Sequence, residues 1–285
     1  MSWNGRTAVV TGASSGIGRA LVQHCAGLGM HVFAADVDRA GLAETEKSIA
    51  SLAGSVESVE TDVRSSEAFE ALAARAYEAR GAVHLFFNNA GVLVDGKSWE
   101  RSEADWRWQI EVNVIGVVNG IRAFVPRMLA QGQPARIINT GSIGGLIGGG
   151  AFLGPYQASK HAVVAISETL HGELSMESAE VDCSVLCPGE VATGIFQSQR
   201  LLPESQRSDY TTDAERQFHD MVAGTVADGL APSELAARAF EGIEAGRFWL
   251  FPQPAFKPLF ELRAKSILDE SAPKTMAEMM GSPTR

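Results

Sequence analysis

The chain has 285 residues, 45% of them hydrophobic, and a formal net charge of −10 at pH 7. A chain of this length buries roughly three quarters of the surface that it exposes when unfolded, so it can form a core without disulfides or metals. The acidic balance argues against nucleic acid or an anionic membrane surface as a partner.

The cysteines and the amino-terminal residues indicate the compartment. Cys25, Cys183 and Cys187 have neither zinc-ligand spacing nor the pattern of a disulfide framework, so we expect no metal site and a reducing environment. A strand-like segment begins within a few residues of Met1, which leaves no room for a signal peptide. No apolar run reaches the roughly 20 residues of a membrane span. These features predict a cytoplasmic protein that is not bound to a membrane.

Short strand-like runs alternate with helical stretches along the chain, as in a parallel sheet with helices on both faces. Strands are predicted at residues 6–12, 31–36, 56–63, 82–91, 135–142, 181–189 and 248–252. Helices are predicted at residues 17–28, 42–54, 66–81, 103–130, 155–176 and 233–246. Ser102 and Ser233 are expected to cap the helices that follow them.

No repeat, low-complexity tract or linker divides the chain, so we predict one domain. Residues 1–252 are assigned to its catalytic part. Within them, residues 190–231 are too many for an ordinary connection between a strand and a helix, and such long segments are typical of a functional lid. Residues 253–285 contain three prolines and a helical middle, and they are interpreted as an extension of the same domain.

A glycine-rich stretch, TGASSGIG at residues 11–18, lies between the first predicted strand and the first predicted helix. Gly12 is expected to take a positive φ, Gly16 to let a pyrophosphate approach the backbone, and Gly18 to let helix and strand pack closely. The helix N-terminus would present unpaired N–H groups to the phosphates. A β–α turn without a ligand is the alternative, and the strand–turn–helix context favours a cofactor site.

Asp36 ends the second predicted strand, where an acidic side chain can accept hydrogen bonds from the hydroxyls of an adenosine ribose. A carboxylate at this position repels a 2′-phosphate and therefore favours NAD over NADP. Arg39 is a nearby cation that would weaken this preference. An aspartate that only starts a turn is the alternative.

Tyr156 and Lys160 are four residues apart in a predicted helix, so they project from the same side. A free phenol is a poor base at neutral pH, but a nearby ammonium favours the phenolate and is expected to lower the pKa of Tyr156. The pair is therefore interpreted as a general acid/base. A surface tyrosine beside a solvated lysine is the alternative.

Ser142 and Asn113 are two further polar candidates. Ser142 ends the fifth predicted strand, at the carboxyl edge where open α/β sheets bind ligands. Asn113 lies in an apolar helical stretch, where its amide is costly unless it is hydrogen-bonded. Two interpretations of Asn113 stay open: a core asparagine satisfied by backbone groups, or one that positions Lys160 through water.

With these motifs in order, the chain resembles the short-chain dehydrogenases/reductases from residue 6 to about residue 252. The motifs that match are TGASSGIG (11–18), Asp36, DV (62–63), NNAG (88–91), Asn113, Ser142, YQASK (156–160) and PG (188–189) with Thr193. The resemblance implies a single-domain, Rossmann-type, doubly wound parallel sheet with strand order 3-2-1-4-5-6-7. It also implies a homodimer or homotetramer built on the helices at 103–130 and 155–176.

The resemblance also assigns residue roles. It implies a catalytic tetrad of Asn113, Ser142, Tyr156 and Lys160. It implies that residues 62–63 meet the adenine of NAD and that residues 188–193 cover the nicotinamide. The full set of implied cofactor contacts is Gly12, Ser14, Ser15, Gly16, Ile17, Gly18, Asp36, Val37, Asp62, Val63, Asn89, Ala90, Gly91, Tyr156, Lys160, Pro188, Gly189, Val191 and Thr193. The family pattern assigns nothing to residues beyond 253.

The predicted function is NAD-dependent interconversion of a secondary alcohol and a ketone, with Tyr156 as general acid/base and Ser142 holding the substrate oxygen. An NADPH-dependent ketone or 3-oxoacyl reductase is one alternative, which Asp36 disfavours. A catalytically silent cofactor-binding sensor is another, which the complete tetrad disfavours.

Apolar side chains in residues 190–231 predict a bulky, largely apolar or aromatic substrate, because exposing all of them to water would be unfavourable. They are Ile195, Phe196, Leu201, Leu202, Tyr210, Phe218 and Met221. Five glycines between residues 144 and 150 would leave space on the opposite wall. The alternative is that these side chains dock the segment on the domain or on a neighbouring subunit.

Overall fold

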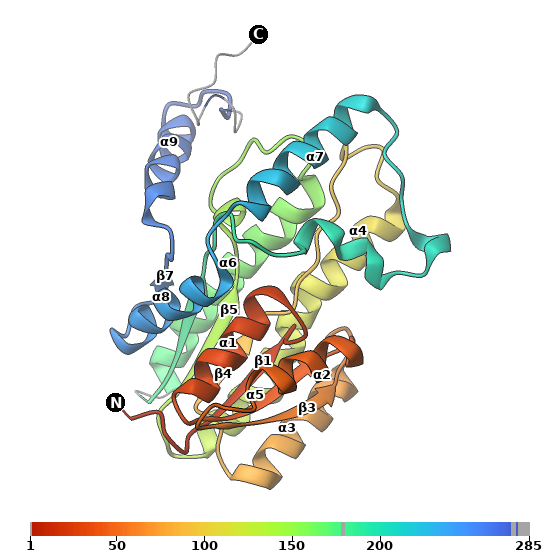
Figure 1. The fold of residues 1–285 in the computed structure, drawn as a ribbon. Helices are drawn as coiled ribbons and strands as arrows, with labels where there is room; N and C mark the ends of the chain where they lie inside the picture. Colours follow the sequence, from red (N-terminus) through yellow and green to blue (C-terminus); the bar gives the residue numbers. More distant parts are fainter. Residues whose placement is uncertain (1, 178–179, 275–277, 279–285) are drawn as a thin grey trace.

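The computed structural model describes residues 2–177, 180–274 and 278. Its centre is a parallel sheet whose seven strands, among the described residues, follow the order β3-β2-β1-β4-β5-β6-β7 (Figure 1). The strands are β1 (Thr7–Thr11), β2 (His31–Asp36), β3 (Ser55–Glu60), β4 (Leu85–Asn88), β5 (Ala135–Thr140), β6 (Val181–Leu186) and β7 (Trp249–Leu250). The predicted sheet and its strand order are confirmed.

Helices cover both faces of the sheet. One face carries α1 (Gly16–Gly27), α2 (Arg39–Ser48) and α8 (Pro232–Glu244), and the other carries α3 (Ser66–Arg80), α5 (Gly116–Ala130) and α6 (Gly154–Glu177). In β4, Phe87 packs in the first of these two cores and Phe86 in the second, where it stacks on Phe124 at 4.2 Å between ring centroids. Successive side chains of a strand thus pack in opposite cores. Because both faces of the sheet are buried, apolar residues occur at consecutive positions of such a strand.

One long helix runs from Glu103 to Ala130 and consists of α4 (Glu103–Ile110), a π-helical turn (Glu111–Ile115) and α5. Ser102 caps it as predicted, because the Ser102 Oγ accepts a hydrogen bond from the Asp105 N–H at 3.1 Å. By length and composition this described helix could cross a membrane, which corrects the expectation that no apolar run is long enough. Its Phe124 and Met128 are fully buried in the second core, so it is a core helix of this fold.

Several predicted boundaries are wrong. Ser233 does not cap α8: this helix starts at Pro232, with Ala231 at the N-cap and no side-chain cap, because proline at the first position is already preorganised for a helix. β4 and β7 are shorter than predicted, and β3 ends at Glu60. The residues left over, such as Asn89–Gly91 and Asp62–Val63, belong to loops beyond the carboxyl ends of the strands.

The segment of residues 190–231 crosses the carboxyl end of the sheet (Figure 1). It contains two 3₁₀ turns (Ile195–Leu201 and Glu204–Gln206) and α7 (Asp213–Ala227). The tail contributes another 3₁₀ turn (Pro254–Phe256) and α9 (Lys257–Leu268), which stand at the same end of the molecule (Figure 1).

Candidate active site

The glycine-rich turn brings β1, α1 and the loop after β4 into close contact. Gly12 has a φ of +68°, and an added Cβ there would lie 2.8 Å from the Ala90 Cα. An added Cβ on Gly18 would lie 1.9 Å from the carbonyl oxygen of Gly12, so the predicted close packing of helix and strand at Gly18 is observed. Ser15, at the N-cap of α1, makes no side-chain cap hydrogen bond. The first N–H groups of α1 are thus left for another acceptor.

A cavity of about 320 Å³ opens at the carboxyl ends of the strands, next to this turn. Ser142, Tyr156 and Lys160 line it, whereas Asn113 does not. Every residue that the family resemblance assigns to the cofactor also lines it: Gly12, Ser14, Ser15, Gly16, Ile17, Gly18, Asp36, Val37, Asp62, Val63, Asn89, Ala90, Gly91, Tyr156, Lys160, Pro188, Gly189, Val191 and Thr193. The fold therefore gathers these predicted residues around one space.

The Asp36 carboxylate is oriented by two backbone groups. It accepts hydrogen bonds from the N–H of Ser14 and from the N–H of Asp38, both at 3.0 Å. Arg39 is directed elsewhere, because its guanidinium pairs with Glu60 on the surface. Asp36 is thus presented to the cavity without a competing cation from Arg39.

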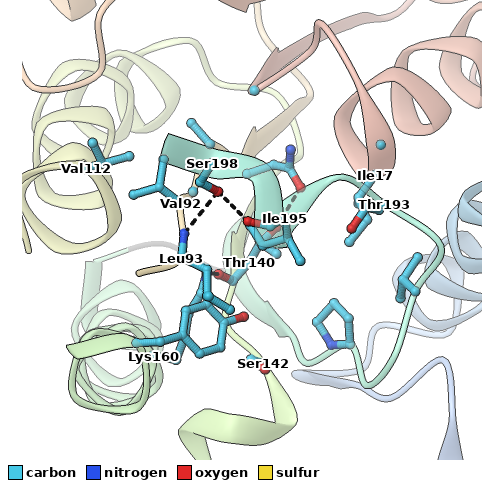
Figure 2. Close-up of a pocket in the computed structure, with 18 of the residues that line it drawn as sticks. Ile17, Val92, Leu93, Val112, Thr140, Ser142, Lys160, Thr193, Ile195 and Ser198 are labelled. Atoms are coloured by element: carbon cyan, nitrogen blue, oxygen red, sulfur yellow. Dashed lines mark hydrogen bonds between the residues drawn. The ribbon is translucent and has the colours of Figure 1, made fainter. Parts of the chain in front are cut away.

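Tyr156 has Lys160 and Ser142 as neighbours in the cavity lining, and Figure 2 shows Lys160 and Ser142 in this lining. The Lys160 Nζ lies 5.7 Å from the centre of the Tyr156 ring and donates a hydrogen bond to the Thr140 carbonyl oxygen at 2.8 Å. The Ser142 Oγ accepts a hydrogen bond from the Gly144 N–H at 3.0 Å and is also hydrogen-bonded to the phenol. A substrate oxygen beside the phenol would therefore meet the serine hydroxyl as well.

The predicted lowering of the Tyr156 pKa is wrong for this structure. Burial raises the pKa of the phenol above its usual value, and the hydrogen bond with Ser142 offsets only part of this rise. Burial also lowers the pKa of Lys160 to about 8. The ammonium is directed to the Thr140 carbonyl, so it does not compensate for the desolvation of the phenol. The phenol, rather than the phenolate, is therefore the form that this environment favours.

Asn113 lies in the π-helical turn, a geometry that is frequent at functional sites. Its Oδ1 accepts a hydrogen bond from the Val92 N–H at 2.8 Å, and its Nδ2 donates to the Val92 carbonyl oxygen at 2.9 Å and to the Ser159 Oγ at 3.0 Å. An added Cβ on Gly91 would lie 3.4 Å both from the Asn113 Oδ1 and from the Lys160 Nζ. Backbone groups and Ser159 therefore satisfy the amide, which lies just behind the cavity wall.

The cavity also has an apolar wall drawn from six parts of the chain. The residues are Leu93, Trp108, Ile147, Leu153, Ile195, Phe196, Leu201, Val222, Val226, Phe256 and Leu259. The 195–201 turn is fixed in this wall because the Ser198 Oγ accepts a hydrogen bond from the Leu93 N–H at 3.1 Å (Figure 2).

Only some of the apolar residues that were predicted to face a substrate line the cavity. Ile195, Phe196 and Leu201 line the cavity. The other four do not: Leu202 packs on the second core, Phe218 packs on Phe152, the Tyr210 hydroxyl donates to Asp95, and Met221 is 62% exposed. Sequence reasoning missed Val222 and Val226, whose spacing of four residues on α7 was the available signal, and it missed Phe256 and Leu259 in the unassigned tail.

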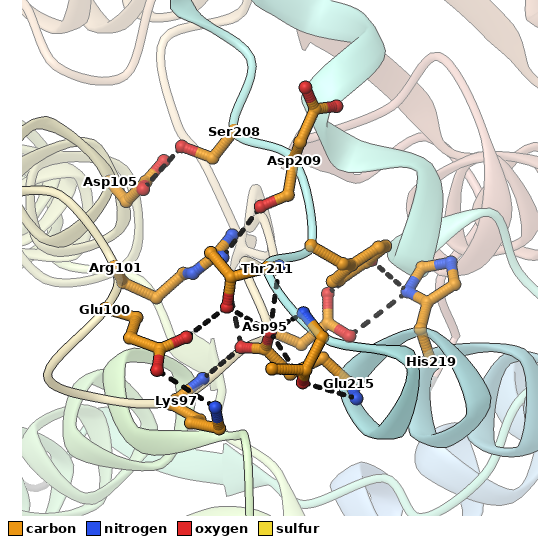
Figure 3. A network of polar contacts seen from close by, with 12 residues as sticks. Asp95, Lys97, Glu100, Arg101, Asp105, Ser208, Asp209, Thr211, Glu215 and His219 are labelled. Atoms are coloured by element: carbon orange, nitrogen blue, oxygen red, sulfur yellow. Dashed lines mark hydrogen bonds and ion pairs between the residues drawn. The ribbon is translucent and has the colours of Figure 1, made fainter.

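Buried polar contacts tie α7 to the loop between β4 and α4 (Figure 3). The Glu215 carboxylate accepts hydrogen bonds from the N–H groups of Lys97 at 2.9 Å, Thr211 at 2.9 Å and Thr212 at 3.0 Å. Arg101 lies 3.9 Å from Glu215, and both side chains are at most 1% exposed. Burial by itself raises the pKa of Glu215, but the hydrogen bonds outweigh it and lower this pKa to about 2.

A second set of contacts joins the same two segments. The Asp95 carboxylate accepts a hydrogen bond from the Tyr210 hydroxyl at 3.0 Å and contacts the His219 Nδ1 at 3.1 Å (Figure 3). Asp95 is almost fully buried. Together with Glu215, it fixes the start of α7 and the turn before it.

Residues 6–202 match the family model described as short chain dehydrogenase. A crystal structure of a short-chain dehydrogenase/reductase from Burkholderia phymatum in complex with NAD is 41% identical, with a TM-score of 0.91, over 96% of this chain and 98% of that chain. The 1-deoxy-11-beta-hydroxypentalenate dehydrogenase of Streptomyces exfoliatus is 36% identical over 86% of this chain and 82% of its own length. The C alpha-dehydrogenase of Sphingobium sp. is 30% identical over 94% of this chain and 87% of its own length.

Proposed function

The chain belongs to the short-chain dehydrogenase/reductase family and is an oxidoreductase of alcohol- or ketone-type substrates, and from this premise we propose that it interconverts a bulky secondary alcohol and its ketone with NAD. One observation carries the proposal. Ser142, Tyr156 and Lys160 meet between the glycine-rich turn and the apolar wall of one cavity. A proton donor thus lies where a cofactor site and an apolar substrate site adjoin.

The residues of the turn fit a nicotinamide dinucleotide. An added Cβ on Gly16 would be only 3.0 Å from the Thr193 Cγ2, so the phosphate side of the cavity depends on glycine. The uncapped start of α1 provides N–H donors for phosphates. A bound nicotinamide dinucleotide would supply hydride transfer to or from the carbinol carbon.

In the proposed mechanism, Tyr156 is the general acid/base. In the reduction direction its phenol donates a proton to the oxygen of the ketone, and in the oxidation direction the phenolate accepts the proton of the alcohol. Ser142 holds the same oxygen. Lys160 is proposed to stabilise the phenolate when it forms and to bind a ribose hydroxyl, and Asn113 is proposed to hold Val92 against α6.

NAD is proposed over NADP because of Asp36. Its carboxylate is held by Ser14 and Asp38 at the second strand, where a ribose is expected, and it would repel a 2′-phosphate. Arg39 pairs with Glu60 instead of facing the cavity, which supports the same choice. The alternative of NADPH-dependent reduction finds no support in these contacts.

A bulky, largely apolar or aromatic substrate is proposed because of the opposite wall, where Leu93, Trp108, Phe196, Val222 and Val226 meet. Burying apolar groups there is favourable in proportion to the area removed from water. A cytoplasmic location and a homodimer or homotetramer built on the Glu103–Ala130 helix and α6 complete the proposal.

The test is a graded series of secondary alcohols, from 2-propanol through cyclohexanol and 1-phenylethanol to 1-(2-naphthyl)ethanol, each with NAD and with NADP. The increase in absorbance of the reduced nicotinamide gives kcat/KM for every pair. We expect kcat/KM to rise along the series and to be higher with NAD. Faster oxidation of 2-propanol than of the alicyclic and aryl carbinols, or a preference for NADP, would contradict the proposal.

A further inference from the structure

The tail of the chain reaches the cavity, although it lies outside the residues that match the family model. Phe256, in the turn before α9, and Leu259, in the first turn of α9, both line the cavity. Figure 1 shows α9 beyond the carboxyl end of the sheet, at the end of the molecule where α7 lies. Two sets of contacts hold the tail in this position.

The first attachment joins the tail to the residues just after β6. The Gln253 Oε1 accepts a hydrogen bond from the Gly189 N–H at 2.8 Å, and its Nε2 donates to the Glu190 carbonyl oxygen at 2.7 Å. The Phe256 ring rests on Gly189, where an added Cβ would lie 2.2 Å from the Phe256 Cε2. The absence of a side chain at Gly189 thus lets the aromatic ring lie against the backbone of this segment.

The second attachment joins α9 to the loop of residues 143–150, which also contributes residues to the cavity lining. The Arg263 Nη1 donates a hydrogen bond to the Leu146 carbonyl oxygen at 2.9 Å. Leu146 packs against the small core cluster around Val164 and Val185, so the acceptor belongs to a packed part of the loop. The tail is therefore attached at two places, after β6 through Gln253 and to the loop of residues 143–150 through Arg263.

The spacing of residues in the tail shows which face of α9 is turned inward. Phe256, Leu259, Arg263 and Ser266 follow one another at intervals of three or four residues, which places them on one side of a helix. Two of them line the cavity, Arg263 binds the loop, and Ser266 is buried. Leu268, on another side of the same helix, is 82% exposed.

We propose that the tail, residues 253–268, is a wall of the substrate site and that Leu259 and Phe256 select alcohols with an extended apolar group. This inference rests on the proposed function. It adds that the tail determines how long an apolar group of the alcohol can be. An apolar arm that reaches from the carbinol towards α9 gains contact with both side chains, whereas a compact alcohol does not reach them.

The main test compares Leu259→Ala with Leu268→Ala, a matched substitution on the exposed side of the same helix. For 1-(2-naphthyl)ethanol we expect Leu259→Ala to lower kcat/KM by about tenfold, the effect of removing a few methylene groups from an apolar pocket. For 2-propanol the loss should stay below about twofold, since a compact alcohol makes no contact with Leu259. Leu268→Ala should leave both values unchanged.

Two further variants separate a role in the site from a role in folding. Leu259→Met keeps the volume of the side chain and should restore most of the lost kcat/KM for the naphthyl alcohol. Phe256→Ala should show the same selectivity for the larger alcohol as Leu259→Ala. Equal losses for both alcohols, or no loss in Leu259→Ala, would overturn the inference.

A binding measurement keeps this inference apart from the proposed function. The fluorescence of 1-(2-naphthyl)ethanol reports its binding to the protein in the presence of NADH, whether or not it is oxidised. A Kd that is about tenfold weaker in Leu259→Ala, and unchanged in Leu268→Ala, would support the tail as a wall of the site even if no alcohol were turned over. An unchanged Kd in both variants would overturn the inference and leave the reaction to be judged by turnover alone.

Discussion

The parts of the cavity proposed to hold the cofactor (the cofactor side, at the glycine-rich turn and Asp36) and the substrate (the substrate side, at the apolar wall) are held in different ways. On the cofactor side, Asp36 is positioned by the N–H of Ser14, only 22 residues earlier in the chain. On the substrate side, Tyr210 binds Asp95 and Arg263 binds Leu146, partners that are 115 and 117 residues apart. Turn and strand geometry thus shape one side, and long-range side-chain contacts shape the other.

From this difference we expect substitutions on the two sides to change different properties of the protein. The cofactor side is part of the β–α turns, so a change there should alter cofactor binding and leave substrate selection intact. The substrate side consists of added segments, α7 and α9, whose attachment uses buried polar groups and single hydrogen bonds. A change there should alter stability and substrate selection and leave cofactor choice intact.

The largest effect is expected at Tyr156, where the two sides meet. Tyr156→Phe removes the proposed acid/base group and should lower kcat by roughly 100-fold or more, while NADH binding is retained. Steady-state turnover and NADH fluorescence titration measure the two quantities.

Tyr77→Phe is the matched control. The Tyr77 hydroxyl donates to the Gln131 Oε1, and neither residue lines the cavity, so turnover should not change. Turnover of Tyr156→Phe near the wild-type value would remove Tyr156 from the mechanism.

The next effect is expected at Glu215. Glu215→Gln leaves the Arg101 charge buried without its carboxylate partner, which should lower the free energy of unfolding by about 3 kcal/mol. Because α7 carries Val222 and Val226, the KM for a bulky alcohol should rise while NAD binding is unchanged. Denaturant unfolding and steady-state kinetics test both statements.

The control is Glu234→Gln, which breaks the exposed pair of Glu234 with Arg238 and should cost less than about 1 kcal/mol. The wild-type protein should also lose the contribution of Glu215 in acid. The folded-state pKa of Glu215, about 2, lies below its value in the unfolded chain, so this stability is present above about pH 4.5 and is lost as the pH falls towards 2. Equal acid sensitivity of wild type and Glu215→Gln would argue against this role.

A smaller effect is expected for Asp36→Ser, which confines the change to the cofactor side. Without the carboxylate, the ratio of kcat/KM for NAD to that for NADP should fall by about tenfold, because a hydrogen-bonded charge is lost and repulsion of the 2′-phosphate is relieved. The order of alcohols by kcat/KM should stay the same.

Asp38→Ser is its matched control. Asp38 caps α2 by accepting a hydrogen bond from the Gly41 N–H, and serine is also a good N-cap residue. The cofactor ratio of this variant should equal that of the wild type. If the wild-type protein already prefers NADP, the interpretation of Asp36 is wrong.

The smallest effect is expected for Arg39→Gln. Because Arg39 pairs with Glu60 on the surface, removing its charge should change the NAD to NADP ratio by less than about twofold. The same kinetic measurements with both cofactors give this ratio. A sharp fall in the use of NADP would show that Arg39 turns to the 2′-phosphate.

Local sequence was sufficient for much of the fold and for the cofactor side. The alternation of short apolar runs with helical stretches predicted the strands, since a strand buried on both faces carries apolar residues at nearly every position. Gly12 and Gly18 could be identified because a turn with positive φ and a helix in van der Waals contact with a strand exclude any side chain. Asp36 could be placed because it ends a strand of a parallel sheet. The strand order and the tetrad were inferred from the family resemblance.

Other features of the site depend on the tertiary structure alone. It raised the pKa of Tyr156, because desolvation depends on everything packed around the phenol and not on the spacing to Lys160. It satisfied the Asn113 amide with Val92 and Ser159, and it placed Leu259 beside the cavity, through contacts between elements far apart in the chain. Local patterns carry propensity and turn geometry, whereas burial and long-range partners exist only once the elements have packed.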